Sequence, residues 1–117
     1  MKYQAIQIFK LMYCALYDLW SKTNDVGLSI YLSEANPFLC EKGSADPIVY
    51  NDFAKLFGEE KEIDDFGYAF IITYLKQLDT YYGDILSNFA KLTREEYVAI
   101  CERNISLSDE ELKNKYV

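Results

Sequence analysis

The sequence predicts an all-α protein, and three observations lead to this fold class. Apolar residues recur every three or four positions along two long stretches, 2–22 and 62–82, which is the spacing of one helix face. Capping residues, glycine and proline stand at the ends of these and of shorter helical stretches. Strand signals are nearly absent, since the chain contains no Asn-Gly or Asp-Gly hairpin dipeptide. We therefore expect one domain over residues 1–117, with five or six helices around the two long ones.

The first long helix, predicted over residues 2–22, has a wide apolar face. One stripe repeats at helical spacing, and further apolar residues flank it. The stripe consists of Ile6, Phe9, Tyr13, Leu16 and Trp20. A face of this width indicates a helix that is covered on more than one side, either by the rest of the chain or by a second copy of it.

Residues 26–35 predict a short helix after a turn. Gly27 weakens this helix, and a strand is the alternative because the letters SIYLS alternate between polar and apolar. Residues 36–46 form the longest irregular stretch, and loops of this length in compact domains are often functional. The loop contains apolar residues, so we expect part of it to turn inward; the sequence does not indicate whether it binds a ligand.

A third helix is predicted to begin at Asp46-Pro47 and to end at Gly58. Asp caps a helix, and proline suits the first helical position because its missing N–H is not needed there. The predicted inward face consists of Ile48, Val49, Phe53, Leu56 and Phe57. Residues 84–91 predict a short helix or a turn.

Two capping boxes mark the start of the last helices. In the stretch from Thr93 to Glu96, the hydroxyl and the carboxylate satisfy each other's helix-end amides, which predicts a helix over 94–103. The stretch from Ser108 to Glu111 repeats the pattern and predicts a short C-terminal helix.

The letters EEKEIDD at residues 59–65 place five carboxylates in seven positions. We expect them in the approach and first turn of the helix at 62–82, where each exposed carboxylate interacts with the helix dipole by about 0.3–1 kcal/mol. Because this effect fades within a turn, it explains two or three of the five. A solvated helix start is the first interpretation, since charge runs are usually solvated. A docking surface for a basic partner is the alternative, and an active site is the third interpretation. The five are Glu59, Glu60, Glu62, Asp64 and Asp65.

Two adjacent tyrosines stand at the predicted end of the same helix, between two carboxylates. Tyr81 and Tyr82 would offer contact area as binding anchors, while Asp79 and Asp84 would attract a basic partner. The alternative is that Tyr81 completes the apolar stripe of the helix and that only Tyr82 is exposed.

Net charge argues against two classes of partner. The chain carries a formal charge of −7, of which residues 59–117 contribute −6 through seven basic and thirteen acidic side chains. Such a chain repels phosphate, so we expect neither direct nucleic-acid binding nor binding to a membrane. A basic protein is the partner that this field attracts.

Cysteine usage indicates a reducing compartment. The three cysteines, Cys14, Cys40 and Cys101, form no CxxC pair, and two of them lie inside apolar helical patterns. We expect buried free thiols and a cytoplasmic protein, because no stretch is long and apolar enough to span a bilayer and the N-terminus lacks the features of a signal peptide.

The chemistry of most active sites is missing. The chain contains no histidine, which removes the common catalytic triads and most zinc sites, and no glycine-rich phosphate cradle. A carboxylate pair such as Glu62 and Asp65, three apart on a helix, remains as a metal-dependent alternative. We expect no enzymatic activity, no cofactor and no metal.

The sequence thus predicts a small acidic cytoplasmic protein that acts by binding another protein. Its most concrete form is an immunity-type inhibitor that neutralises a basic toxin such as a nuclease, by presenting carboxylates where the enzyme expects phosphates. The alternative is a homo-oligomeric structural or regulatory helical domain, in which a homodimer covers the helix at 2–22. The expected partner-binding residues are Glu59, Glu60, Glu62, Asp64, Asp65, Asp79, Tyr81, Tyr82 and Asp84.

Overall fold

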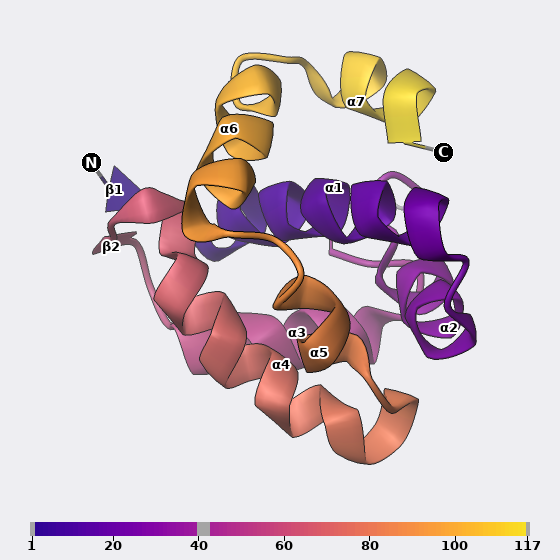
Figure 1. Cartoon of the computed structure of the whole chain (residues 1–117). Coiled ribbons are helices and arrows are strands. Elements are labelled where there is room, and N and C mark those ends of the chain that lie inside the picture. The colour runs from indigo at the N-terminus through magenta and orange to yellow at the C-terminus, as the bar shows by residue number, and fades with distance from the viewer. Residues whose placement is uncertain (1, 40–42, 117) are drawn as a thin grey trace.

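The all-α fold class is confirmed by a computed structural model, which describes residues 2–39 and 43–116. Its central helix is α1 (Ala5–Thr23). The other elements, in chain order, are β1 (Lys2–Tyr3), α2 (Val26–Ala35), α3 (Pro47–Phe57), β2 (Lys61–Glu62), the 3-10 turn η1 (Asp65–Gly67), α4 (Tyr68–Tyr82), α5 (Ile85–Phe89), α6 (Arg94–Asn104) and α7 (Asp109–Tyr116). Figure 1 shows α6 and α7 on one side of α1, and α3, α4 and α5 on the other. These described residues form seven α-helices rather than five or six, since the ambiguous segment 84–91 contributes α5.

The wide apolar face of α1 is covered from within the chain. Helices α2, α3, α5 and α6 all pack against it. Ten of its 19 residues are buried, and none of its large apolar side chains is among the exposed ones of the described chain. The rest of the chain therefore covers most of this apolar face.

Residues 26–35 form a helix, so the strand alternative is wrong. The Asp25 carboxylate caps α2 by accepting a hydrogen bond of 2.9 Å from the backbone N–H of Leu28. Gly27 has a packing role, because a Cβ atom at this position would lie 2.0 Å from the carbonyl oxygen of Tyr82, at the end of α4. Gly27, which lowers the helix propensity of this segment, thus allows α2 to approach α4 closely.

The predicted boundaries of α3 are confirmed, and the irregular stretch before it turns partly inward. Asp46 accepts a hydrogen bond of 3.1 Å from the backbone N–H of Ile48, Pro47 takes the first helical position, and Gly58 follows the last turn with a φ of 83°. Phe38 in the preceding loop is buried, whereas Leu39 is 58% exposed. Residues 40–42 of this loop lie outside the described chain.

The second long helix begins at Tyr68, not at residue 62 as predicted. Lys61 and Glu62 instead pair antiparallel with the N-terminal strand, Tyr3 facing Lys61 and Lys2 facing Glu62. Asp65 and Phe66 then take left-handed φ angles of 51° and 52°, which an α-helix does not allow. The first helix likewise begins at Ala5 because the preceding residues form β1.

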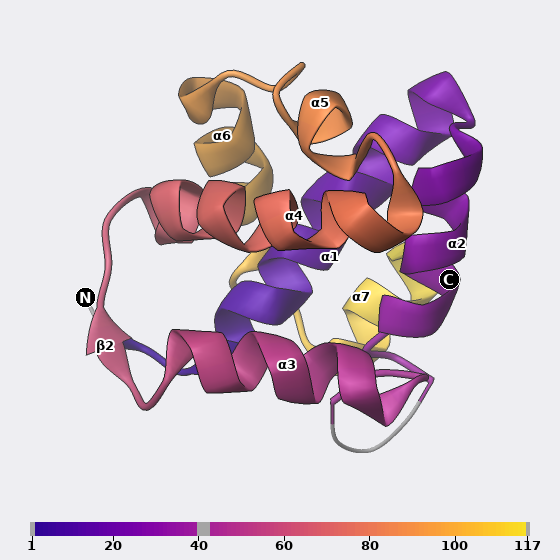
Figure 2. The ribbon, with the colours of Figure 1, turned by 90° about the horizontal axis from the view of Figure 1, so that it is seen from below.

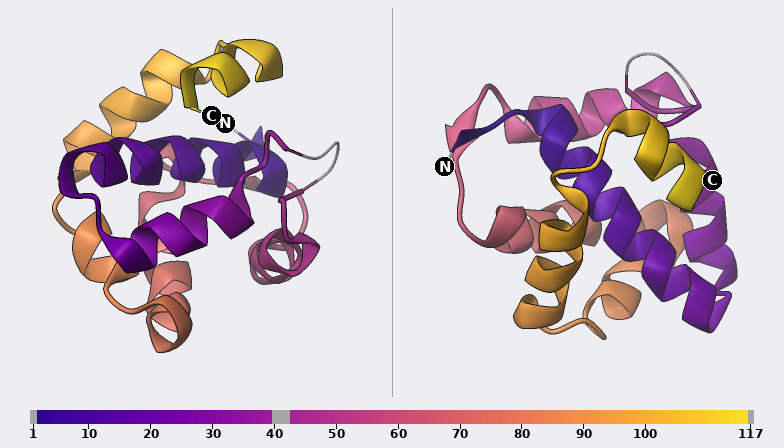
Figure 3. Two further views of the ribbon diagram at one scale, coloured as in Figure 1. Left: turned by 90° about the vertical axis from the view of Figure 1, so that its right-hand side faces the viewer. Right: turned by 90° about the horizontal axis from the view of Figure 1, so that it is seen from above.

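Both capping boxes form as predicted. In the first, the Thr93 hydroxyl accepts from the Glu96 N–H at 3.1 Å, and the Glu96 carboxylate accepts from the Thr93 N–H at 3.0 Å. Ser108 and Glu111 repeat the arrangement at 3.1 and 3.0 Å. The second box opens α7, which lies above α1 in the left view of Figure 3.

The two described cysteines agree with the expectation of buried free thiols. Cys14 and Cys101 are buried free thiols, and burial raises the pKa of each to about 12; Cys40 lies outside the described residues. Among the described residues, no helix combines the length and the apolar character required to cross a membrane.

Candidate functional site

A groove of about 550 Å³ lies where α2, α3 and α4 meet, and it combines apolar side chains with carboxylates. The three helices pack against one another in pairs. Figure 2 shows α3 and α4 running side by side, with α2 near the end of the pair that holds the start of α3 and the end of α4. The residues that line the groove lie between positions 30 and 34 of α2, between 46 and 52 at the start of α3, and between 74 and 82 of α4.

The apolar rim of the groove consists of three exposed side chains, one from each helix. Ile30 of α2 is 50% exposed, Ile48 of α3 is 66% exposed, and Tyr81 of α4 is 84% exposed. Single exposed apolar residues are common on protein surfaces, whereas these three surround one groove. Ile48 was predicted to face inward, and the structure corrects this.

The charged groups of the groove all have the same sign. Glu34, Asp46 and Asp52 line it, and no Lys or Arg of the described chain does. Asp46 is partly engaged, because its carboxylate caps α3. A concave site with three carboxylates and apolar walls concentrates a negative potential, since the walls are of low dielectric.

Hydrogen-bonded tyrosines form one wall of the groove. The Tyr82 hydroxyl donates a hydrogen bond of 2.9 Å to Oε2 of Glu34, and the ring of Tyr82 packs edge-on against Tyr31 at 5.2 Å. Tyr31 and Tyr74 share a hydrogen bond of 2.9 Å between their hydroxyls. Burial raises the pKa of Tyr74 to about 12, and burial together with the Glu34 carboxylate raises the pKa of Tyr82. Both hydroxyls are therefore protonated at neutral pH.

The structure places the predicted tyrosine pair on this groove. Tyr81 is the exposed member on the rim, while Tyr82 is half-buried and holds Glu34. The alternative that Tyr81 completes the buried stripe of the helix is wrong. Tyr82, and not Tyr81, is the partly buried member of the pair, because its ring packs against Tyr31 of α2.

The two carboxylates beside the tyrosines lie outside the groove lining. One oxygen of Asp79 accepts a hydrogen bond of 3.0 Å from the Leu86 N–H, so this side chain holds the turn between α4 and α5. Asp84 is exposed and stands just before α5, where its backbone carbonyl accepts hydrogen bonds from Asn88.

The acidic run 59–65 lies at the other end of α4. That helix is 15 residues long, so its two ends are about 22 Å apart. No acidic residue stands in the first turn of α4, so the dipole explanation for the run is wrong. Glu62 belongs to β2, which also means that Glu62 and Asp65 do not share a helix face.

Within this acidic run, the Asp65 carboxylate is neutralised by the protein itself. Asp65 forms an ion pair of 2.8 Å with Arg94, whose guanidinium also lies 5.0 Å from the centre of the Tyr68 ring. Glu59, Glu60 and Asp64 are exposed. The nine predicted partner-binding residues thus separate into two groups, and of these residues Tyr81 and Tyr82, at the end of α4, line the groove.

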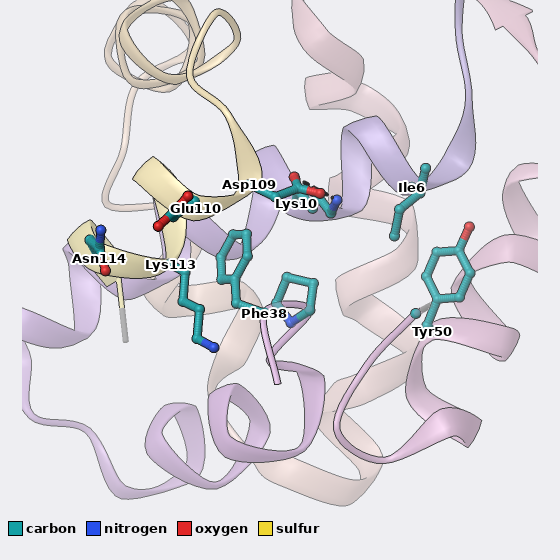
Figure 4. Close-up of a pocket in the computed structure, with 10 residues that line it drawn as sticks. Ile6, Lys10, Phe38, Tyr50, Asp109, Glu110, Lys113 and Asn114 are labelled. Atoms are coloured by element: carbon teal, nitrogen blue, oxygen red, sulfur yellow. Dashed lines mark hydrogen bonds and ion pairs between the residues drawn. The ribbon is translucent and has the colours of Figure 1, made fainter. Parts of the chain in front are cut away.

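A second cavity, of about 900 Å³, lies between α1, α3, α7 and the loop before α3 (Figure 4). Lys10 and Asp109 point toward each other in it and form an ion pair of 2.8 Å. Glu110 and Lys113 add one further charge of each sign. The cavity is larger than the groove, but its charges are balanced, so it favours no ligand charge.

Sequence reasoning missed the groove because its members are far apart in the chain. Glu34, Asp52 and Ile30 carry no local signal, and Asp46 was identified only as a helix cap. Tyr81 and Tyr82 were the members of the groove that the sequence identified as candidate binding residues. Among the described residues, no group of three or more Cys, Asp or Glu side chains is arranged to hold a metal ion.

Comparison with known proteins gave no relative: no protein-family model matches the chain, and no curated protein and no solved structure matches it either.

Proposed function

We propose that the protein acts by binding a basic segment of another protein in the groove between α2, α3 and α4. One observation carries the proposal: three carboxylates and three exposed apolar side chains converge there, without a Lys or Arg from the described chain. Interfaces gain most of their affinity from a few aromatic or apolar anchors, with charge setting the choice of partner. Tyr81, Ile30 and Ile48 are the anchors in this proposal.

The most concrete form of this function is an immunity-type inhibitor that neutralises a basic toxin, such as a nuclease, in the cytoplasm. A nuclease offers Lys and Arg side chains that bind phosphates, and the carboxylates of the groove fit the same side chains. The net charge of −7 supports fast association with a basic partner, because long-range attraction raises the encounter rate.

The acidic run has a secondary role in this proposal. Glu59, Glu60 and Asp64 are exposed but lie far from the groove, so they contribute to the long-range field and not to the contact. Salt screens such a field over about 8 Å at physiological ionic strength. Exchange of these carboxylates for lysine is expected to slow association while leaving the dissociation rate nearly unchanged.

A homodimer through the same groove is disfavoured by charge. Two copies facing each other across this surface would bring Glu34, Asp46 and Asp52 of both chains together, and like charges at an interface are repulsive. The native mass at low micromolar concentration separates the two proposals, since a monomer is expected.

The test is a pull-down with matched variants of the tagged full chain, washed at low and then at high salt. Bound proteins are identified by mass spectrometry. A basic protein that binds the natural chain should be lost with the double variant Ile48→Ser and Tyr81→Ala. It should be retained by Ile105→Ser, which removes an exposed apolar side chain outside the groove. If the double variant retains every basic protein that the natural chain binds, the groove is not the binding site.

A further inference from the structure

We infer that the groove selects arginine over lysine, with Glu34 receiving the guanidinium group and Tyr82 positioning the Glu34 carboxylate. This inference rests on the proposed function, since it names the side chain that the groove recognises. It commits to one occupant: a protein segment that carries an arginine flanked by apolar residues.

Glu34 is the carboxylate of the groove that is held by another side chain. Its Oε2 atom accepts the hydrogen bond of 2.9 Å from the Tyr82 hydroxyl. Its other oxygen, Oε1, accepts no hydrogen bond from the described residues. A carboxylate has about four lone-pair sites, so both oxygens still have room for a ligand N–H. Because one oxygen is anchored, the plane of the carboxylate is fixed before any ligand arrives.

The position of Tyr82 is set by the core. Its ring packs against Tyr31, which is fully buried and shares a hydrogen bond with Tyr74. Its backbone carbonyl lies so close to Gly27 that no side chain fits between them. Contacts from α2 therefore hold the end of α4 in place. The Tyr82 hydroxyl, positioned in this way, in turn orients the Glu34 carboxylate. A carboxylate pre-organised in this way gains more from a ligand of matching geometry than a mobile one does.

Arginine has the matching geometry, and lysine does not. A guanidinium presents two parallel N–H groups that bind both oxygens of one carboxylate, whereas an ammonium acts as a point charge. The exposed ring of Tyr81 offers a face on which a guanidinium stacks. Ile30 and Ile48 of the rim face the apolar residues on either side of the arginine.

The experiment is an NMR titration of the ¹⁵N-labelled full chain with two capped tripeptides, acetyl-Ile-Arg-Leu-amide and acetyl-Ile-Lys-Leu-amide. Both peptides carry the same charge and the same apolar residues. The arginine peptide is expected to shift the amide signals of α2, α3 and α4 at the groove and to bind about tenfold more tightly, since it forms one more charge-assisted hydrogen bond.

Three variants separate recognition from structure. Glu34→Gln keeps the size of the side chain and an oxygen that accepts from Tyr82, and it is expected to abolish the preference for arginine. Tyr82→Phe is expected to reduce the preference by several-fold while lysine binding is retained. Glu102→Gln, an exposed carboxylate on α6, is the control and should change neither affinity. Melting curves of all three confirm that each is folded.

The outcomes distinguish this inference from the proposed function. If both peptides bind at the groove with equal affinity, or if Glu34→Gln keeps the preference, the inference is overturned and the groove remains a site for basic segments. If neither peptide shifts the groove signals at millimolar concentration, the inference and the proposed function both fail. A preference that disappears in Glu34→Gln and persists in Glu102→Gln supports the inference.

Discussion

The Tyr97 hydroxyl donates a hydrogen bond of 2.8 Å to the backbone carbonyl of Phe66, and this contact connects α6 to the turn that precedes α4. Phe66 and its neighbour Asp65 both have left-handed φ angles, which cost non-glycine residues roughly 1–2 kcal/mol each. The Asp65–Arg94 ion pair joins the same two segments. Arg94 and Tyr97 of α6 therefore stabilise the strained turn that precedes α4.

Replacing Tyr97 by phenylalanine tests the importance of this contact. The variant Tyr97→Phe keeps the ring, which packs against Tyr68 and Phe89, and removes only the hydroxyl. We expect the free energy of unfolding to fall by about 1–2 kcal/mol, because the Phe66 carbonyl loses its hydrogen bond. Urea unfolding followed by circular dichroism measures the change. Tyr81→Phe, at an exposed position, is the control and should shift it by less than about 0.5 kcal/mol.

The variant Gly27→Ala tests the close approach of α2 to α4. Exchange of glycine for alanine in a helix ordinarily stabilises it by up to about 1 kcal/mol. Here the new Cβ atom would meet the Tyr82 carbonyl oxygen at 2.0 Å, and this backbone atom cannot move without displacing the end of α4. We expect a lower melting temperature, measured by circular dichroism. Ser33→Ala, at an exposed position of the same helix, should leave it nearly unchanged; an increase for Gly27→Ala would contradict the packing described here.

The buried thiols should be unreactive in the native protein. Cys14 and Cys101 are fully buried, and burial raises the pKa of each to about 12, so the nucleophilic thiolate is scarce at neutral pH. In the variant Cys40→Ser, we expect no thiol to react with Ellman's reagent at pH 8 within minutes. Both should react when the protein is unfolded in guanidinium chloride. Rapid reaction of either thiol in the folded variant would show that the core opens readily.

Alkaline pH should unfold the protein through its buried tyrosines. The pKa of Tyr74 and that of Tyr116 are raised by burial from 10.0 to about 12, and burial also raises the pKa of Tyr31. A raised pKa means that the neutral form is favoured in the folded state. The stability from these groups is therefore complete below pH 10 and is lost as the pH rises through 12.

Absorbance at 295 nm, which reports tyrosinate, can be followed together with circular dichroism from pH 8 to pH 12.5. We expect the exposed tyrosines to ionise first, and the buried ones to ionise in the same transition in which the helices unfold. Ionisation of every tyrosine near pH 10 without loss of helix would contradict the burial of Tyr31 and Tyr74.

Local chemistry was sufficient to predict much of the fold. Helix starts at Asp46-Pro47, at Thr93 and at Ser108 were predictable because a cap bonds to amides only two or three residues away. The buried stripe of α1 was predictable because helical spacing is a property of the chain itself. None of these features depends on a distant partner.

The start of α4 depended on contacts that the local pattern does not contain. Ile63 and Phe66 continue the helical spacing of α4, which is why a helix was predicted from residue 62. The helix instead begins at Tyr68, because Lys61 and Glu62 pair with the N-terminal strand and Phe66 accepts a hydrogen bond from Tyr97. These partners lie about 60 and 31 residues away along the chain.

The sequence by itself determined the helical class, the caps, the covered α1, the net negative charge and the absence of histidine. Only the tertiary structure decided which carboxylates lie together. Packing joined Glu34, Asp46 and Asp52 with Tyr81 and Tyr82 at one groove, while it paired Asp65 with Arg94 at the far end of α4. The reason is physical: charge and periodicity are properties of the local sequence, but a groove between helices is set by how separate helices pack.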